Sequence, residues 1–260
     1  MARRMLWILV LVMLAASALA EEASAPSSLR ECTTFEEAEA FLLYPPEEGI
    51  AGVEAGYIRL IAQHRAGDDA FRDAYWQGGE PGSVLDLTLQ KSSTGRDYAY
   101  HAGNMCTRAV YSMALSYLGV DVTPGAMSAM VGQRDLNPPY SEVSELVGVE
   151  RVVPKAHVFN TMVENYLTDP SYSPVYVYLR RPDGKTHALL IIGVIPDTGR
   201  YIVLDPSGMW ANGVQYRIYM MSFNKSRRQV LNSTFRKEYA GSEILALYQW
   251  RLIPQEESEP

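Results

Sequence analysis

The fold is decided by T-H-A-L-L-I-I-G-V at residues 186–194 and Y-I-V-L-D-P at residues 201–206. Both are apolar runs of strand length, and the turn sequence Pro196-Asp197-Thr198-Gly199 separates them. A similar run at residues 175–179 precedes a second turn, Pro182-Asp183-Gly184. The sequence therefore predicts an antiparallel meander in an α+β domain.

His187 opens the first of these runs and Asp205 closes the second. Their separation of 18 positions is even, so the two side chains share a face only if the connecting loop has an odd number of residues. Placing them directly opposite requires residue 192 to pair with residue 200. This predicts a seven-residue loop from Gly193 to Gly199, with Pro196 at its centre, where the missing N–H is harmless.

A buried helix is predicted upstream, from Cys106 to Leu118. One face carries apolar side chains, and Gly119 follows where a left-handed helix end is expected. Cys106 stands at the helix start, where the dipole and the free backbone N–H groups favour thiolate over thiol. A nucleophilic cysteine needs an imidazole to shuttle a proton, and the imidazole needs an acceptor to fix its tautomer. Cys106, His187 and Asp205 are therefore the candidate catalytic residues.

The remaining patterns divide the chain near residue 95. Residues 21–95 are expected to form a helical extension or cap, and residues 96–254 the main domain, before an acidic tail at 255–260. Within the extension, Thr34-x-x-Glu37 predicts a capping box for a helix ending at Leu43. Further expected elements are two short helices within 56–76, a strand at 84–89, a helix start at Thr123-Pro124 and a helix at 158–167.

Residues 1–20 have the three parts of a secretory signal: two arginines, an apolar run and a small-residue end, A-L-A. An uncleaved anchor is the alternative, but the run is short for a membrane span. We therefore expect a secreted or periplasmic protein without stable membrane insertion. Removing Arg3 and Arg4 with the signal changes the formal net charge from −7 to −9. Nucleic acid is not expected as a partner, because phosphate binding relies on a basic surface.

The chain resembles the papain-like cysteine peptidases, and within them the branch of the bacteriocin leader-processing peptidases. The resemblance is carried by M-C-T-R-A-V-Y-S-M-A-L-S-Y-L-G, S-P-V-Y-V-Y-L, T-H-A-L-L-I-I-G-V and Y-I-V-L-D-P, so it covers about residues 98–210. It implies a helix carrying the nucleophile packed on an antiparallel sheet. By this likeness Cys106 is the nucleophile, His187 the general acid/base and Asp205 its orienter, and Trp210 shields the His–Asp pair from water.

Two features depart from the family pattern. Relatives usually carry Cys-Gly-Pro at the nucleophile, where this chain has Cys106-Thr107-Arg108. They also place a glutamine five or six residues earlier to complete the oxyanion hole, whereas no glutamine lies between Gln90 and Cys106. The candidate donors here are His101 or Tyr100 by register, and Asn104 by chemistry. Loss of one such donor costs about a hundredfold to a thousandfold in rate.

The expected function is an exported thiol hydrolase that cleaves a peptide or related amide bond, with a peptide or protein as substrate. One alternative is a transglutaminase-like acyl transferase, although the 81 residues from Cys106 to His187 are long for that class. The other is a non-catalytic binding protein in which Cys32 and Cys106 form a disulfide. We predict instead that Cys106 is free and that Cys32 is unpaired or available to another chain.

No cofactor is expected. Two cysteines without C-x-x-C spacing, and histidines without metal-like partners, give no metal site.

Overall fold

The computed structural model describes residues 26–43, 55–58, 106–122, 144–145, 147–152, 159–211, 214–224, 228–234 and 236–254. The expected signal segment at 1–20, the strand at 84–89, the helix start at Thr123 and the acidic tail at 255–260 lie outside these residues. So does most of the 56–76 segment, of which residues 56–58 are described. Within the described ranges, no helix has the length and hydropathy needed to cross a bilayer.

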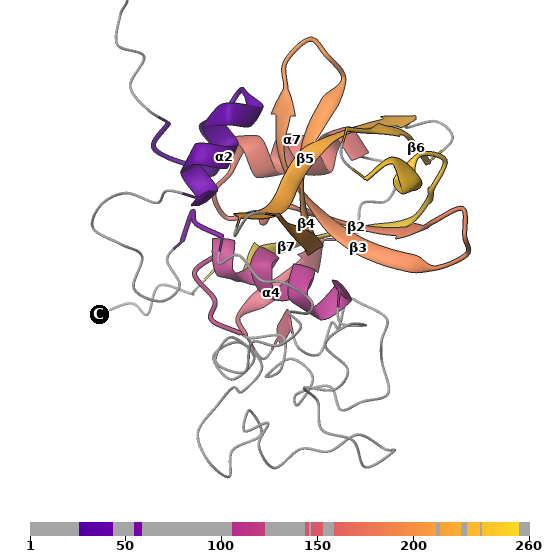
Figure 1. Cartoon of the computed structure of the whole chain (residues 1–260). Coiled ribbons are helices and arrows are strands. Elements are labelled where there is room, and N and C mark those ends of the chain that lie inside the picture. The colour runs from indigo at the N-terminus through magenta and orange to yellow at the C-terminus, as the bar shows by residue number, and fades with distance from the viewer. Residues whose placement is uncertain are drawn as a thin grey trace, which may run out of the picture.

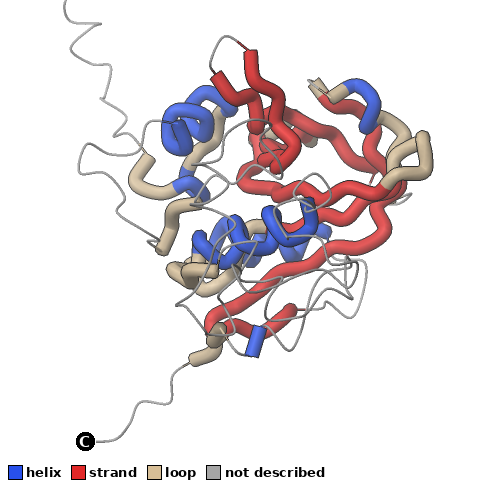
Figure 2. Tube along the Cα trace, turned by 60° about the horizontal axis from the view of Figure 1, so that its bottom comes forward, coloured by secondary structure: helices blue, strands red, loops and turns tan. Residues whose placement is uncertain are grey.

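The described chain is α+β, with few helices and a seven-stranded antiparallel sheet (Figures 1 and 2). The helical elements are η1 (Leu29–Glu31), α2 (Phe35–Leu43), α4 (Cys106–Tyr117), α7 (Phe159–Thr168) and η4 (Lys237–Tyr239). The strands are β1 (Val149–Val152), β2 (Val175–Arg180), β3 (Thr186–Ile195), β4 (Arg200–Ala211), β5 (Val214–Asn224), β6 (Gln229–Ser233) and β7 (Glu243–Leu252). The predicted meander is therefore confirmed as β2, β3 and β4, and the predicted helices at 106–118 and 158–167 as α4 and α7.

The sheet curls back on itself. Its order is β1-β7-β2-β3-β4-β5-β6, and β6 also pairs with β7. Three backbone hydrogen bonds close the ring: Val230 N to Ser242 O, Gly241 N to Val230 O and Ile244 N to Arg228 O, at 2.7–2.8 Å. Closure satisfies the backbone groups that an open edge would expose.

Both faces of the central strands are buried, which explains the continuous apolar run in β3. Side chains of one face, including Leu190 and Leu204, belong to a cluster with α4. Alternate side chains, including Leu189 and Val203, form a second cluster with α7. Figure 1 shows α4 and α7 on opposite sides of these strands.

The described N-terminal residues share the first of these cores. Leu29, Ala38, Leu42 and Ile58 are buried in the same cluster as α4. These described N-terminal residues therefore share a core with α4. The predicted capping box is confirmed: the Glu37 backbone N–H donates to Thr34 Oγ1, and the Thr34 backbone N–H donates to the Glu37 carboxylate, both at 3.1 Å.

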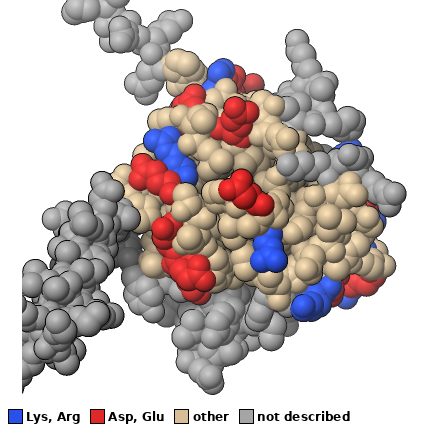
Figure 3. Space-filling model, turned by 90° about the horizontal axis from the view of Figure 1, so that it is seen from above, with Lys and Arg blue, Asp and Glu red and all other residues tan. Residues whose placement is uncertain are grey.

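Charged side chains of both signs are interspersed on the face shown in Figure 3. Acidic groups occur at several points, and Lys and Arg side chains lie between them. The described residues on this face therefore form a mixed surface rather than a field of one sign.

Candidate active site

The β3–β4 hairpin brings His187 and Asp205 together by a route that the sequence did not predict. Its loop has four residues, Pro196 to Gly199, because Ile195 pairs with Arg200. The predicted seven-residue loop is therefore wrong. An even loop alone would place His187 and Asp205 on opposite faces.

A β-bulge at Ile192 restores the shared face. Ile191 pairs with Val203 and Gly193 with Ile202, so Ile192 is an extra residue in β3. Past the bulge Leu190 pairs with Leu204, which sets Asp205 across from Leu189, two positions from His187. The two site residues are therefore diagonal neighbours on one face of the sheet, close enough for long side chains to touch.

The Asp205 carboxylate accepts four hydrogen bonds. His187 Nε2 donates to Oδ1 at 2.7 Å, and the Ser207 backbone N–H donates to the same oxygen at 2.8 Å. The hydroxyl groups of Tyr219 and Tyr239 donate to Oδ2 at 2.6 and 3.1 Å. Asp205 is only 1% exposed, so these donors replace the water that an ionised carboxylate requires.

The environment holds His187 and Asp205 as an ion pair. Burial opposes ionisation of both groups, but their mutual charge and hydrogen bond outweigh it. The pKa of His187 is raised to about 10, and the nearby Cys106 side chain adds a smaller contribution in the same direction. The pKa of Asp205 is lowered, with further help from Tyr219 and the Ser207 backbone.

Cys106 is the first residue of α4, which packs against β3, the strand that carries His187. Its side chain lies near enough to the His187 ring to contribute to the raised pKa of that imidazole, whose Nε2 faces Asp205. Nδ1 is therefore the nitrogen left for the thiol. The backbone N–H groups of the first helical turn have no partner within the helix, so they can stabilise negative charge near the sulfur.

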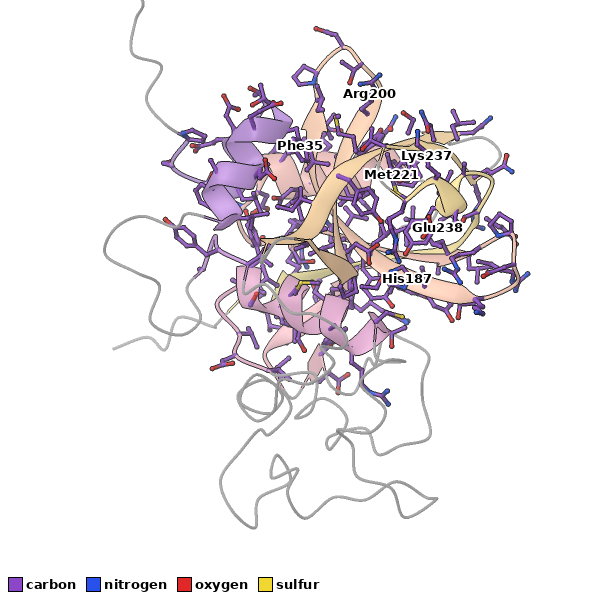
Figure 4. All side chains as sticks on the ribbon, in the orientation of Figure 1. Phe35, His187, Arg200, Met221, Lys237 and Glu238 are labelled. Carbon is purple, nitrogen blue, oxygen red and sulfur yellow. The ribbon has the colours of Figure 1, made fainter. Side chains whose placement is uncertain are left out.

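Tyr239 and Arg236 support the His187–Asp205 pair. The Tyr239 ring stacks on His187, with ring centroids 5.5 Å apart and planes inclined by 27° (His187 is labelled in Figure 4). The Arg236 guanidinium lies over the same tyrosine ring, 5.4 Å from its centroid. Arg236 Nη2 also donates to the Tyr239 hydroxyl at 3.3 Å and to Ser207 Oγ at 2.9 Å.

The other predicted site residues lie outside the part of the chain whose side chains the structure describes. His101, Asn104 and Tyr100, the candidate oxyanion donors, lie outside the described residues. Trp210 is in β4, but its side chain is also outside the described part, so its predicted shielding role remains a prediction. The aromatic side chain that the structure does place against His187 is Tyr239.

Both cysteines are free thiols. Cys32 is unpaired, which is one of the two states predicted for it, and it is only 3% exposed. Burial, together with the charges of Glu37 and Glu31, raises its pKa to about 11. The described residues contain no cluster of three or more His, Cys, Asp or Glu side chains suited to a metal ion.

Sequence reasoning missed the network around Asp205, formed by Ser207, Tyr219, Tyr239 and Arg236. One signal was available for Tyr219: Tyr219, Met221 and Phe223 alternate along β5 on the face that carries Asp205. Tyr239 and Arg236 reach the site from a 3₁₀ turn and the residue before it, where no periodicity applies.

Comparisons with known proteins give no relative. No protein-family model matches the chain, no curated protein is similar to it, and no solved structure matches its fold.

Proposed function

We propose that this protein is an exported thiol hydrolase with a papain-like fold, cleaving a peptide or related amide bond through Cys106, His187 and Asp205. The observation that carries the proposal is the buried 2.7 Å hydrogen bond between His187 and Asp205, with Cys106 at the start of α4 near enough to influence the pKa of the same imidazole. A nucleophile, a base and an orienter brought together at one site are the components of covalent acyl transfer.

The first half of the reaction forms an acyl-enzyme. The Cys106 thiolate attacks the amide carbonyl carbon, forming a C–S bond and placing negative charge on the carbonyl oxygen. That oxygen is stabilised by backbone N–H groups at the start of α4. The C–N bond then breaks, and the proton on His187 Nδ1 passes to the leaving nitrogen. The products are a thioester on Cys106 and a free amine.

The second half releases the acid. His187, now neutral, accepts a proton from water as the water oxygen attacks the thioester carbonyl. The C–S bond breaks, the carboxylic acid leaves, and the proton returns the thiolate–imidazolium pair to its starting state. Asp205 stays ionised throughout, holding Nε2–H and directing Nδ1 toward the sulfur.

A peptide-library digestion tests the proposal. The purified protein is incubated with the library and new termini are identified by mass spectrometry. Cys106→Ala and His187→Gln should each reduce product formation by a thousandfold or more. Cys32→Ala is the matched control, because it removes a thiol that the mechanism does not use, and it should retain activity.

The outcomes separate the rival functions. Equal cleavage by Cys106→Ala would disprove the assignment. No cleavage of any library member, together with no alkylation of Cys106 before reduction, would favour the binding protein. Incorporation of an added fluorescent primary amine in place of water would identify an acyl transferase.

A further inference from the structure

We propose that Tyr239 is a positioning residue that fixes the His187–Asp205 pair twice, by its ring and by its hydroxyl group, and that Arg236 holds Tyr239 in place. This inference rests on the proposed function of the same site. It assigns roles to two residues that neither touch the scissile bond nor belong to the catalytic triad.

One side chain contacts both members of the pair. The Tyr239 ring stacks on the His187 imidazole, while its hydroxyl donates to Asp205 Oδ2 at 3.1 Å. Rotation of the imidazole about its Cβ–Cγ bond would tilt the ring out of the stack, and rotation of the carboxylate would break the hydrogen bond. Both motions that would misdirect Nδ1 are therefore opposed by the same side chain.

The hydroxyl of Tyr239 has a defined direction. It carries one proton, and the ionised Asp205 carboxylate can only accept. Arg236 Nη2, which can only donate, occupies the acceptor side of the same oxygen at 3.3 Å. The hydroxyl proton must therefore point at Asp205, which makes the contact a charge-assisted hydrogen bond.

Arg236 joins the two arms of the network. The same Nη2 donates to Ser207 Oγ, and the Ser207 backbone N–H donates to Asp205 Oδ1. The guanidinium thus anchors one donor for each carboxylate oxygen, Ser207 for Oδ1 and Tyr239 for Oδ2, without touching the carboxylate. Figure 4 labels Lys237 and Glu238 of η4 and His187 of β3.

Tyr219 provides an internal comparison. It donates to the same Oδ2 at 2.6 Å, but its ring is paired with Tyr239, at a centroid distance of 6.5 Å. Tyr219→Phe and Tyr239→Phe each remove one donor to Oδ2 and keep the aromatic ring. Tyr239→Leu removes the donor and the ring that stacks on His187. Comparing the three variants separates the hydroxyl from the stack.

The first readout is the rate constant for alkylation of Cys106 by iodoacetamide at pH 7, followed by intact mass. Tyr239→Leu should lower it roughly tenfold, and Tyr239→Phe and Tyr219→Phe by less, because loss of alignment weakens the thiolate–imidazolium contact. The matched control is Tyr172→Leu, since Arg251 lies 5.7 Å over the Tyr172 ring and its Nη1 donates to the hydroxyl at 3.4 Å. That control removes an Arg–Tyr pair of similar geometry outside the site and should leave the rate unchanged.

The second readout is the NMR resonance of the proton between His187 Nε2 and Asp205, identified by its loss in His187→Gln. Its exchange with water should be slow in the wild type and in Tyr239→Phe, and fast in Tyr239→Leu. A structural defect elsewhere in the protein would not produce this pattern. If Tyr239→Leu does not fold, Tyr239→Phe combined with Arg236→Gln replaces it, with the same expected direction.

Wild-type alkylation and exchange rates in Tyr239→Leu, or in the replacement double variant, would overturn the inference. Both readouts are independent of peptide cleavage. Failure of this inference can therefore be distinguished from failure of the proposed hydrolase activity.

Discussion

The Tyr166 hydroxyl group of α7 donates a 2.9 Å hydrogen bond to the backbone carbonyl oxygen of Ile192, the extra residue of the β3 bulge. A bulge takes one residue out of the regular ladder, and its polar backbone groups need partners elsewhere when they are buried. Tyr166 therefore stabilises the irregularity that places His187 and Asp205 on one face. The bulge is thus hydrogen bonded to a helix outside the site.

Tyr166→Phe should lower the free energy of unfolding by about 1–3 kcal/mol, because it leaves the buried Ile192 carbonyl without a donor. Urea unfolding measures the change. Tyr178→Phe on β2, where the tyrosine is half-buried, serves as the control and should shift stability by less than about 0.5 kcal/mol. Equal stability of Tyr166→Phe and wild type would show that the bulge does not need this hydroxyl.

Gly193→Ala should destabilise the protein by about 1–3 kcal/mol through overpacking. A Cβ at this position would lie 3.1 Å from Ile202 Cδ1, the atom that Ile202→Val removes. The Gly193→Ala, Ile202→Val double variant should therefore lose less unfolding free energy than the two single variants lose together, by about 1 kcal/mol. Strictly additive unfolding energies would show that the contact between residues 193 and 202 does not limit the size of the side chain.

The stability difference between wild type and His187→Gln should depend on pH with a maximum between about pH 4 and 6.5. The pKa of His187 is raised from 6.5 to about 10 in the folded state, so its contribution is complete below pH 6.5 and is lost as the pH rises toward 10. The slope on that side is at most about 1.4 kcal/mol per pH unit. The pKa of Asp205 is lowered from 3.8, so its contribution is present above about pH 4 and is lost as the pH falls. A constant difference from pH 4 to 9 would contradict a buried ion pair.

Iodoacetamide should label Cys106 but not Cys32 in the native protein at pH 8 without reductant. Both thiols are buried, but Cys106 stands at the start of α4 beside His187, whereas burial raises the pKa of Cys32 to about 11, so almost none of Cys32 is thiolate at pH 8. Intact mass should show one added label in the wild type, none in Cys106→Ala, and two after denaturation. Failure to label Cys106 before reduction would indicate a disulfide and shift support to the binding-protein alternative.

The regular elements were predictable because their side-chain periodicity is local. The apolar runs of β2 to β4 and the apolar face of α4 are each contained in one stretch of sequence. The Thr34–Glu37 capping box likewise depends on residues three apart. Most predicted boundaries of these elements lie within one or two residues of the observed ones. The exception is the end of β4, which runs to Ala211.

The hairpin loop was not predictable from the same information. Both a seven-residue loop and a four-residue loop with a bulge place His187 and Asp205 on one face, and parity cannot distinguish them. The bulge is bonded to Tyr166, 26 positions away, and such a long-range contact leaves no local pattern in the sequence. The donors around Asp205 were hidden for the same reason, since Tyr219 and Tyr239 are 14 and 34 positions from it.

The closure of the sheet also imposes an order of events during biosynthesis. The last strand of the described chain, β7, lies between β1 and β2 and completes the ring with β6. A ribosome will have released Cys106, His187 and Asp205 well before Glu243–Leu252 emerges, yet β2 has no partner on its outer edge until then. Non-local pairing of this kind forms late. We therefore expect the candidate catalytic residues to emerge before the sheet can close, and their final alignment to require the C-terminal strand β7.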